Sequence, residues 1–149
     1  MGAGQPMRFW EASAIIPLFV NQSGSARVRK LAEQDGEMTV WWGTLVECQG
    51  AWVRLRREGA IDPESALRVR EEFEELRARW GEIQPSADVR DSAVLLLQRH
   101  PLRAADALQL GAALTWASGA STSRAFVSLD ERLREAAERE GFTVLPSHA

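Results

Sequence analysis

Apolar residues occur along the chain in short bursts that alternate with longer stretches of helical periodicity. The bursts that are short and rich in β-forming residues predict buried strands at residues 7–10, 38–42, 125–129 and 142–145. The stretches with helical periodicity predict helices at residues 13–20, 26–35, 45–58, 62–80, 87–98, 103–118 and 130–141. Because strands separated by helices usually pair in parallel, the pattern predicts an α/β protein with a mainly parallel sheet.

The residues at the ends of several predicted helices suit those positions. Ser13 and Thr44 are predicted N-caps, because a hydroxyl oxygen there can accept a hydrogen bond from an N–H of the first turn. Pro63, directly after Asp62, is typical of the first turn of a helix. Gly59 is expected to end the helix that begins near Thr44.

Length and composition indicate a single globular domain. The chain has 149 residues, 45% of them hydrophobic and 26% charged. We predict one domain over residues 1–149, with residues 1–6 as a flexible extension. A single cysteine, Cys48, excludes an intramolecular disulfide and a cysteine-based zinc site, so a reducing, cytoplasmic location is expected. The apolar stretch at residues 12–20 is too short to span a bilayer, so no membrane association is expected.

Four acidic residues occupy the positions that carry most information about function. Glu11 and Asp130 directly follow two of the predicted strands, and Glu47 and Asp106 lie in the first turns of two predicted helices. Ligands of parallel sheets bind beyond the carboxyl ends of the strands, so these acids can converge at one sheet edge. Oxygen ligands suit Mg²⁺ or Mn²⁺, and such ions assist the hydrolysis of phosphodiesters. Taken singly, each acid also has a structural interpretation as a helix cap or as a partner of the helix dipole.

The segments around these acids resemble the PIN domain, and more narrowly the VapC-like ribonuclease toxins of bacterial toxin–antitoxin pairs. The resemblance extends from Arg8 to Pro146, and its segments are residues 9–15, 44–47, 102–110, 126–133 and 140–146. The most specific match is Leu102-Arg103-Ala104-Ala105-Asp106-Ala107-Leu108-Gln109-Leu110. The resemblance implies a PIN-like α/β/α sandwich with a short, mainly parallel central sheet surrounded by helices.

The resemblance also implies roles for individual residues. It makes Glu11, Glu47, Asp106 and Asp130 the metal-binding and catalytic acids of a ribonuclease that uses Mg²⁺ or Mn²⁺. Two serines would support them with hydrogen bonds: Ser13 would orient Glu11, and Ser128 would act near Asp130. We therefore expect hydrolysis of RNA phosphodiesters by an activated water.

The sequence departs from the family pattern at three positions. Glu11 stands where the family strongly prefers Asp, Ala12 stands where Thr is usual, and Gln109 stands where His is frequent. The longer Glu11 side chain suggests an alternative: a PIN-fold protein that binds RNA or an antitoxin with weakened or lost catalysis. Gln109 is not expected to bind the metal. A third hypothesis is an unrelated α/β domain whose acids cap helices.

Several partners are expected. RNA is the expected substrate, and Arg54 and Arg57 are candidate RNA contacts, although a solvated helix face explains them as well. The resemblance implies a cognate antitoxin, whose segment would enter a groove along the helix at residues 62–80, and a homodimer. Phe73 and Trp80 either line that groove or face the core. The other tryptophans are expected mainly in the core, with the stacking of RNA bases as the alternative.

Overall fold

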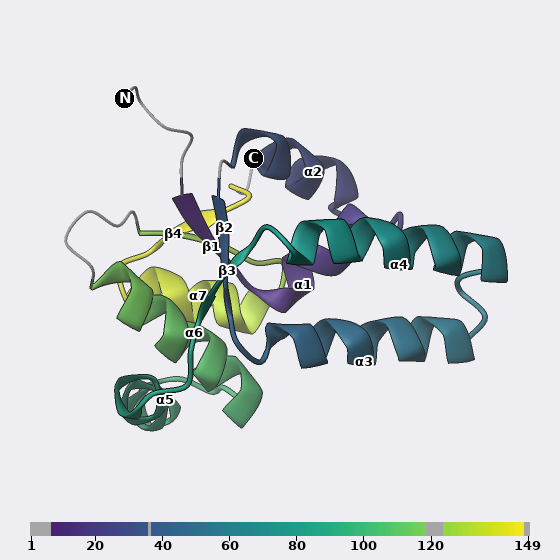
Figure 1. Cartoon of the computed structure of the whole chain (residues 1–149). Coiled ribbons are helices and arrows are strands. Elements are labelled where there is room, and N and C mark those ends of the chain that lie inside the picture. The colour runs from purple at the N-terminus through teal and green to yellow at the C-terminus, as the bar shows by residue number, and fades with distance from the viewer. Residues whose placement is uncertain (1–6, 36, 119–123, 148–149) are drawn as a thin grey trace.

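The computed structural model describes residues 7–35, 37–118 and 124–147 and shows one parallel sheet with helices on both faces (Figure 1). The expected extension at residues 1–6 lies outside the described residues. The strands follow the order β3-β2-β1-β4-β5, and every pair of neighbours is parallel. Their bounds are β1 Met7–Trp10, β2 Glu37–Trp41, β3 Gly81–Ile83, β4 Ala125–Val127 and β5 Thr143–Leu145.

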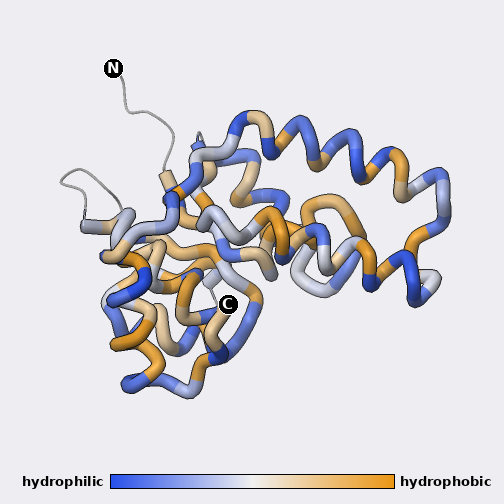
Figure 2. The backbone as a smooth tube through the Cα atoms, turned by 60° about the horizontal axis from the view of Figure 1, so that its bottom comes forward, coloured by the Kyte–Doolittle hydropathy of each residue, from blue (hydrophilic) through white to orange (hydrophobic). Residues whose placement is uncertain are grey.

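The helices form the outer layers and confirm the expected α/β/α sandwich. Their bounds are α1 Ala12–Ile15, the 3-10 turn η1 Ile16–Leu18, α2 Ser25–Gln34, α3 Thr44–Arg57, α4 Pro63–Arg77, α5 Ala87–Arg99, α6 Ala104–Ala117 and α7 Glu131–Arg139. Hydrophobic and hydrophilic residues are interleaved along these helices, as expected for helices with one buried face (Figure 2). None of the described helices is both long and apolar enough to cross a membrane.

Two clusters of buried side chains hold the helices to opposite faces of the sheet. Phe9 belongs to the cluster with α5, α6 and α7, whereas Trp10 belongs to the cluster with α1, α2, α3 and α4. This division follows from the strand geometry, because consecutive side chains of a strand point to opposite faces. Both residues are fully buried, so β1 lies at the centre of the molecule as well as at the centre of the sheet.

Helix α6, which carries Asp106, is fixed closely against α5. At Gly111 a Cβ atom would lie 2.9 Å from the carbonyl oxygen of Val89, closer than such contacts are found. Glycine therefore allows the two helix backbones to approach each other at this point. The position of α6 relative to the sheet is set by this packing and by the buried side chain of Leu110.

The structure differs from the sequence predictions in one missed strand, one helix end and two N-caps. Strand β3 was not predicted, because Gly81–Ile83 is short and carries the acidic Glu82 in its middle. The helix expected at residues 62–80 ends at Arg77, and Trp80 lies outside it, next to β3. The N-caps also differ: Glu11 rather than Ser13 caps α1, and Thr44 lies inside α3, whose N-cap is Gly43.

The tryptophans confirm the expectation of core packing with one exception. Trp10 is fully buried, and the other buried indoles are each 8% exposed; these are Trp41, Trp52, Trp80 and Trp116. Trp42 is 51% exposed and contacts Trp41 edge-on. Phe73 is 1% exposed and Trp80 is 8% exposed, so both belong to the core, and Phe73 also lines a pocket between α3 and α4.

Candidate acidic site

The parallel sheet brings the segments that carry the acids to one edge. Glu11 follows β1, Asp130 follows β4, and α3 with Glu47 begins three residues after β2. Strands β2, β1 and β4 are neighbours in the sheet, so their carboxyl ends lie side by side. The backbone N–H of Glu11 donates to the carbonyl oxygen of Val127 at 2.9 Å, which ties the end of β1 to the end of β4.

The Glu11 carboxylate is enclosed by hydrogen-bond donors from both strand ends. Its Oε1 accepts the hydroxyls of Ser13 at 2.5 Å and Ser128 at 2.6 Å, and its Oε2 accepts the backbone N–H of Ser13 at 2.9 Å. The Ser13 Oγ in turn accepts the N–H of Leu129 at 2.9 Å. Glu11 is therefore both the N-cap of α1 and the junction between α1 and the segment after β4.

Burial dominates the electrostatics of Glu11. The residue is 5% exposed, and loss of solvation raises the pKa of its carboxyl from 4.5 to about 7. Hydrogen bonds from the two serines act in the opposite direction, and the negative charge of Glu47 adds a further increase. Glu47 is thus close enough to Glu11 for the two carboxylates to repel each other.

Glu47 and Asp106 form the more open part of the acidic site. Both are partly exposed. Partial burial raises the pKa of Glu47, the hydrogen bond from Gln109 lowers it, and the charge of Asp106 raises it. Electrostatic coupling therefore runs from Glu11 to Glu47 and from Glu47 to Asp106. One Asp106 oxygen also lies 3.4 Å from the backbone nitrogen of Arg103, at the start of α6.

Gln109 connects the helices that carry these two acids. Its side-chain Nε2 donates to Glu47 Oε1 at 2.6 Å and to Thr44 Oγ1 at 2.9 Å. Gln109 and Thr44 are both fully buried. The amide thereby joins the first turn of α3 to α6, one helical turn beyond Asp106.

Asp130 lies beside the Glu11 network and caps α7. Its Oδ1 accepts the N–H of Leu133 at 3.1 Å, and its own N–H donates to Ser128 Oγ at 3.1 Å. The buried Arg134 supports this corner by donating to the carbonyl oxygens of Ser128 and Pro146, each at 2.7 Å. The Ser128 hydroxyl therefore donates to Glu11, while the Ser128 carbonyl oxygen accepts a hydrogen bond from Arg134 of α7.

The oxygen-only character of the acids suits a hard divalent cation, although the side chains are not gathered around one point. Across residues 7–35, 37–118 and 124–147, no three His, Cys, Asp or Glu side chains lie close enough together to hold one ion. Within the same residues no Lys, Arg or His forms an ion pair with any of the four acids. The repulsion between Glu11 and Glu47 and between Glu47 and Asp106 is of the kind that a bound cation relieves.

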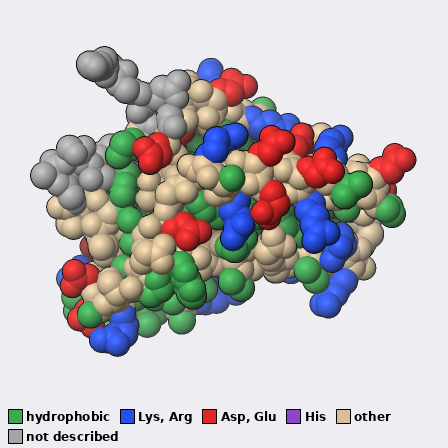
Figure 3. Space-filling view, in the orientation of Figure 1, with side chains coloured by type: hydrophobic (Ala, Val, Ile, Leu, Met, Phe, Trp, Pro, Cys, Tyr) green, Lys and Arg blue, Asp and Glu red, His purple; other side chains and the backbone are tan. Residues whose placement is uncertain are grey.

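Basic residues lie further along α3. Arg54 and Arg57 are exposed in its last turn, and Figure 3 shows Lys and Arg side chains gathered over the ends of α3 and α4. At about 100° per residue, Arg54 lies on the same face of α3 as Glu47, about 10 Å along the axis. Arg56 lies on the opposite face.

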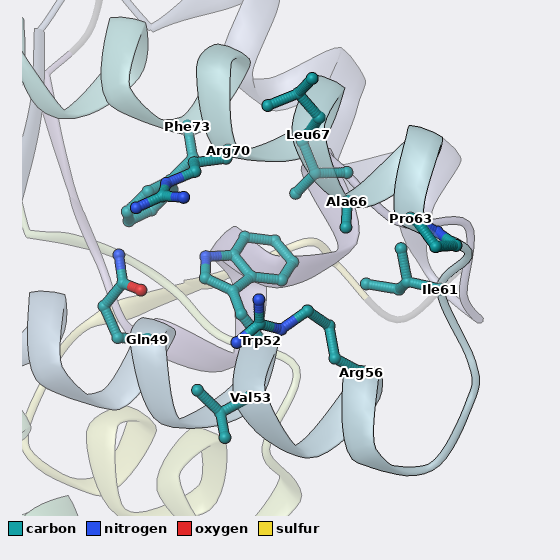
Figure 4. Close-up of a pocket in the computed structure, with 11 residues that line it drawn as sticks. Gln49, Trp52, Val53, Arg56, Ile61, Pro63, Ala66, Leu67, Arg70 and Phe73 are labelled. Atoms are coloured by element: carbon teal, nitrogen blue, oxygen red, sulfur yellow. The ribbon is translucent and has the colours of Figure 1, made fainter.

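A pocket of about 510 Å³ separates α3 from α4. Figure 4 shows the Trp52 indole at its centre, with Phe73 and Leu67 on the α4 side. Arg56 and Arg70 also line the pocket, so its apolar surface is bordered by two positively charged guanidinium groups. Leu67 is 59% exposed, which leaves an apolar side chain on the surface beside the pocket.

Comparison with solved structures identifies the fold class as that of VapC-like PIN domains. No protein-family model matches the sequence, and no curated protein matches it. VapC20 of Mycobacterium tuberculosis, a toxin that cleaves the sarcin-ricin loop, is similar with a TM-score of 0.62 and 16% identity, over 92% of this chain and 96% of that one.

Two further structures have the same fold. A toxin-antitoxin complex from Klebsiella pneumoniae matches with a TM-score of 0.56 and 17% identity, over 84% of this chain and 88% of that one. PAE2754 from Pyrobaculum aerophilum matches with a TM-score of 0.61 and 18% identity, over 91% and 83% respectively. The fold expected from the sequence resemblance is thus confirmed.

Gln109 is the residue near the acids whose contacts the sequence did not reveal. The sequence indicates only that it does not bind the metal, yet it donates directly to Glu47. The available signal was helical spacing: Gln109 lies three residues after Asp106, so both side chains emerge from adjacent turns of one helix. The contact with α3 depends on how the two helices pack, which the spacing does not specify.

Proposed function

We propose that this protein is a divalent-metal-dependent endoribonuclease and the toxin of a toxin–antitoxin pair. The observation that carries the proposal is the placement of Glu11 and Asp130 at the carboxyl ends of neighbouring strands, with Glu47 at the start of α3 joined through Gln109 to the helix of Asp106. Among the described residues no basic side chain forms an ion pair with any of these acids. The VapC-like fold supports the choice of RNA as substrate. Glu11, Glu47, Asp106 and Asp130 would hold Mg²⁺ or Mn²⁺.

The chain's own residues supply position and charge for hydrolysis. A bound ion of this kind lowers the pKa of water and neutralises charge that develops on the phosphate. Ser13 and Ser128 hold the Glu11 carboxylate, and Gln109 holds that of Glu47. Water would attack phosphorus and give a proton to a carboxylate of the acidic site, while the bond to the leaving sugar oxygen breaks and that oxygen takes up a proton from solvent.

Cleavage of a mixed, structured RNA tests this proposal directly. The purified chain, freed of any bound partner, is incubated with Mg²⁺, with Mn²⁺ or with EDTA. The variant Asp106→Asn keeps the side-chain shape and removes one charge from the site. Asp88→Asn is the matched control, because Asp88 is exposed in the first turn of α5, outside the acidic site.

We expect cleavage with a divalent ion, no cleavage with EDTA, and a loss of more than about 100-fold in Asp106→Asn, since replacing even a group that only supports a metal ligand costs about 10–100-fold. Asp88→Asn is expected to retain wild-type activity. Cleavage that persists in EDTA, or equal activity in both variants, would contradict the proposed chemistry.

A second candidate function rests on the contacts of Glu11. Its two oxygens already accept three hydrogen bonds, and its pKa of about 7 disfavours the charged form that binds a cation. The chain would then be a PIN-fold protein that binds RNA or an antitoxin with weak or no catalysis. The variant Glu11→Asp separates the two functions: activity that appears only in this variant favours binding as the native function.

We propose that an antitoxin segment occupies the pocket between α3 and α4. The apolar surface around Trp52 and Leu67, bordered by Arg56 and Arg70, fits an apolar side chain flanked by acidic residues (Figure 4). The structural similarity to a chain of a toxin-antitoxin complex supports such a partner. Growth arrest caused by the chain should be relieved by co-expressing the protein encoded next to it, and Leu67→Glu should block that relief while leaving the arrest unchanged.

Homodimer formation and a cytoplasmic location complete the proposal. Exposed apolar side chains that a second copy would cover include Val94 and Leu95, which are 53% and 54% exposed on α5. Light scattering that gives twice the chain mass of 16.6 kDa would support the dimer. Val94→Lys with Leu95→Lys should then restore the mass of a single chain.

A further inference from the structure

Gln109 has an unusual set of contacts for a buried side chain. It is 0% exposed, and its Nε2 makes both hydrogen bonds of the amide group, to Glu47 Oε1 and to Thr44 Oγ1. Its carbonyl oxygen is buried and accepts no hydrogen bond from any residue that the structure describes. The side chain is therefore only half satisfied.

Such an arrangement disfavours the folded state. A buried acceptor without a partner loses its bonds to water and gains nothing in return. An apolar side chain of the same length would fill the space without this loss. The amide is thus poorly explained by packing, and its benefit must come from what its N–H group does.

The N–H group acts on Glu47. Among the described residues, Gln109 provides the hydrogen bond that holds the Glu47 carboxylate, and the contact joins residues 62 positions apart in the chain. The acceptor Thr44 belongs to the same first turn of α3 and fixes the amide relative to that turn. Glu47 Oε1 is consequently directed toward α6, which carries Asp106.

We propose that Gln109 is a positioning residue that fixes the Glu47 carboxylate beside Asp106 for cation binding. Without this donor, the partly exposed and flexible Glu47 side chain would occupy several rotamers, and each binding event would have to order it again. The inference rests on the proposed function, because it assumes that Glu47 binds the cation.

The test measures Mn²⁺ binding by the full-length chain, stripped of metal with EDTA, using isothermal titration calorimetry. Gln109→Met preserves length and volume but removes the donor, and Gln109→His restores an N–H donor at the same position. Gln98→Leu is the matched control, because Gln98 is exposed on α5. Thermal unfolding of each metal-free variant is recorded alongside.

Gln109→Met is expected to weaken Mn²⁺ binding about 10–100-fold. Its Tm is expected to change little, because removal of the unpaired carbonyl oxygen is offset by the loss of the donor to the buried Thr44 Oγ1. Gln109→His is expected to regain part of the affinity, and Gln98→Leu to bind as the wild type does. This combination separates positioning from stability, since a purely structural residue would change the Tm without weakening Mn²⁺ binding.

Two outcomes would overturn the inference, and Glu47→Gln distinguishes them. If Glu47→Gln loses Mn²⁺ binding but Gln109→Met retains it within about 2-fold, well below the loss expected for a supporting residue, Gln109 does not position Glu47 and the proposed metal site stands. If Glu47→Gln binds Mn²⁺ as the wild type does, the proposed metal site is itself wrong and the role of Gln109 falls with it.

Discussion

The acidic site has two halves that differ in how their carboxylates are held. In the strand-end half, Glu11 accepts three hydrogen bonds, Asp130 caps α7, and Ser128 contacts both residues. In the helix half, Glu47 receives one bond from Gln109, and both Glu47 and Asp106 are partly exposed. The strand-end half therefore contributes to the fold as well as to the acidic character of the site, whereas the helix half has fewer hydrogen bonds and is more exposed.

The largest expected difference between the halves is a pH dependence of stability that comes from Glu11. Because burial raises its pKa from 4.5 to about 7, the folded state holds the proton more tightly than the unfolded chain does. This contribution to stability is fully present below pH 4.5 and is lost as the pH rises through about 7, with a total on the order of 3 kcal/mol. Glu11→Gln cannot titrate and should lack this loss.

Chemical denaturation in EDTA between pH 5 and pH 8 measures the effect. The difference in the free energy of unfolding between wild type and Glu11→Gln isolates Glu11, because other titrating groups contribute equally to both proteins. We expect the stability of Glu11→Gln relative to the wild type to increase steadily as the pH rises. A difference that stays constant over this range would mean that Glu11 is ionised at pH 5 and that the strand-end half is less enclosed than its hydrogen bonds indicate.

A smaller effect is expected when the hydrogen-bond network of the strand-end half is cut at Ser128. Ser128→Ala removes the donor to Glu11 and the acceptor for the N–H of Asp130, both in buried or partly buried surroundings. The free energy of unfolding at pH 6 should fall by about 1–2 kcal/mol. Ser92→Ala on α5, outside the network, serves as the control, and an equal effect of the two changes would show that the Ser128 network adds nothing to the fold.

The corresponding change in the helix half should barely affect stability. Glu47→Ala removes one hydrogen bond, but it also removes a carboxylate that partial burial and Asp106 disfavour. We expect the free energy of unfolding to change by less than about 1 kcal/mol, because loss of the hydrogen bond from the buried Gln109 amide is offset by removal of a disfavoured charge. Denaturation of Glu47→Ala beside Ser128→Ala measures the contrast, and a loss in Glu47→Ala as large as that in Ser128→Ala would remove the distinction between the halves.

The sequence predicted the positions of the acids better than it predicted what contacts them. Glu11 and Asp130 follow strands whose apolar pattern is plain, and Glu47 and Asp106 follow helix starts, so their placement relative to the sheet could be inferred. The cap of α1 was wrong because both Glu11 and Ser13 can accept hydrogen bonds from a first turn. Only the folded geometry shows that the longer side chain of Glu11 reaches back to the Ser13 N–H.

Strand β3 and the Gln109 contact illustrate what a local pattern does not contain. Gly81–Ile83 becomes a strand because β2 offers it a parallel edge, with Thr39 opposite Gly81, and not because of its own composition. The Gln109 contact depends on how closely α6 approaches α3. In both cases the decisive interaction joins residues that are distant in the sequence.

The smallest effect concerns how RNA would reach the helix half along α3. Arg54 lies on the Glu47 face of α3, whereas Arg56 lies on the face that lines the α4 pocket. Both are exposed arginines, so they differ only in the direction in which they project from the helix. If RNA follows the Glu47 face, Arg54→Ala should weaken binding of a short single-stranded RNA in EDTA by a few-fold. It should also reduce the dependence of log Kd on log salt by about 0.7, the value for one phosphate contact.

Arg56→Ala should leave both quantities unchanged, as measured by fluorescence anisotropy at several KCl concentrations. The reverse result would place the RNA over the α3–α4 pocket, and RNA and the proposed antitoxin segment would then compete for one surface.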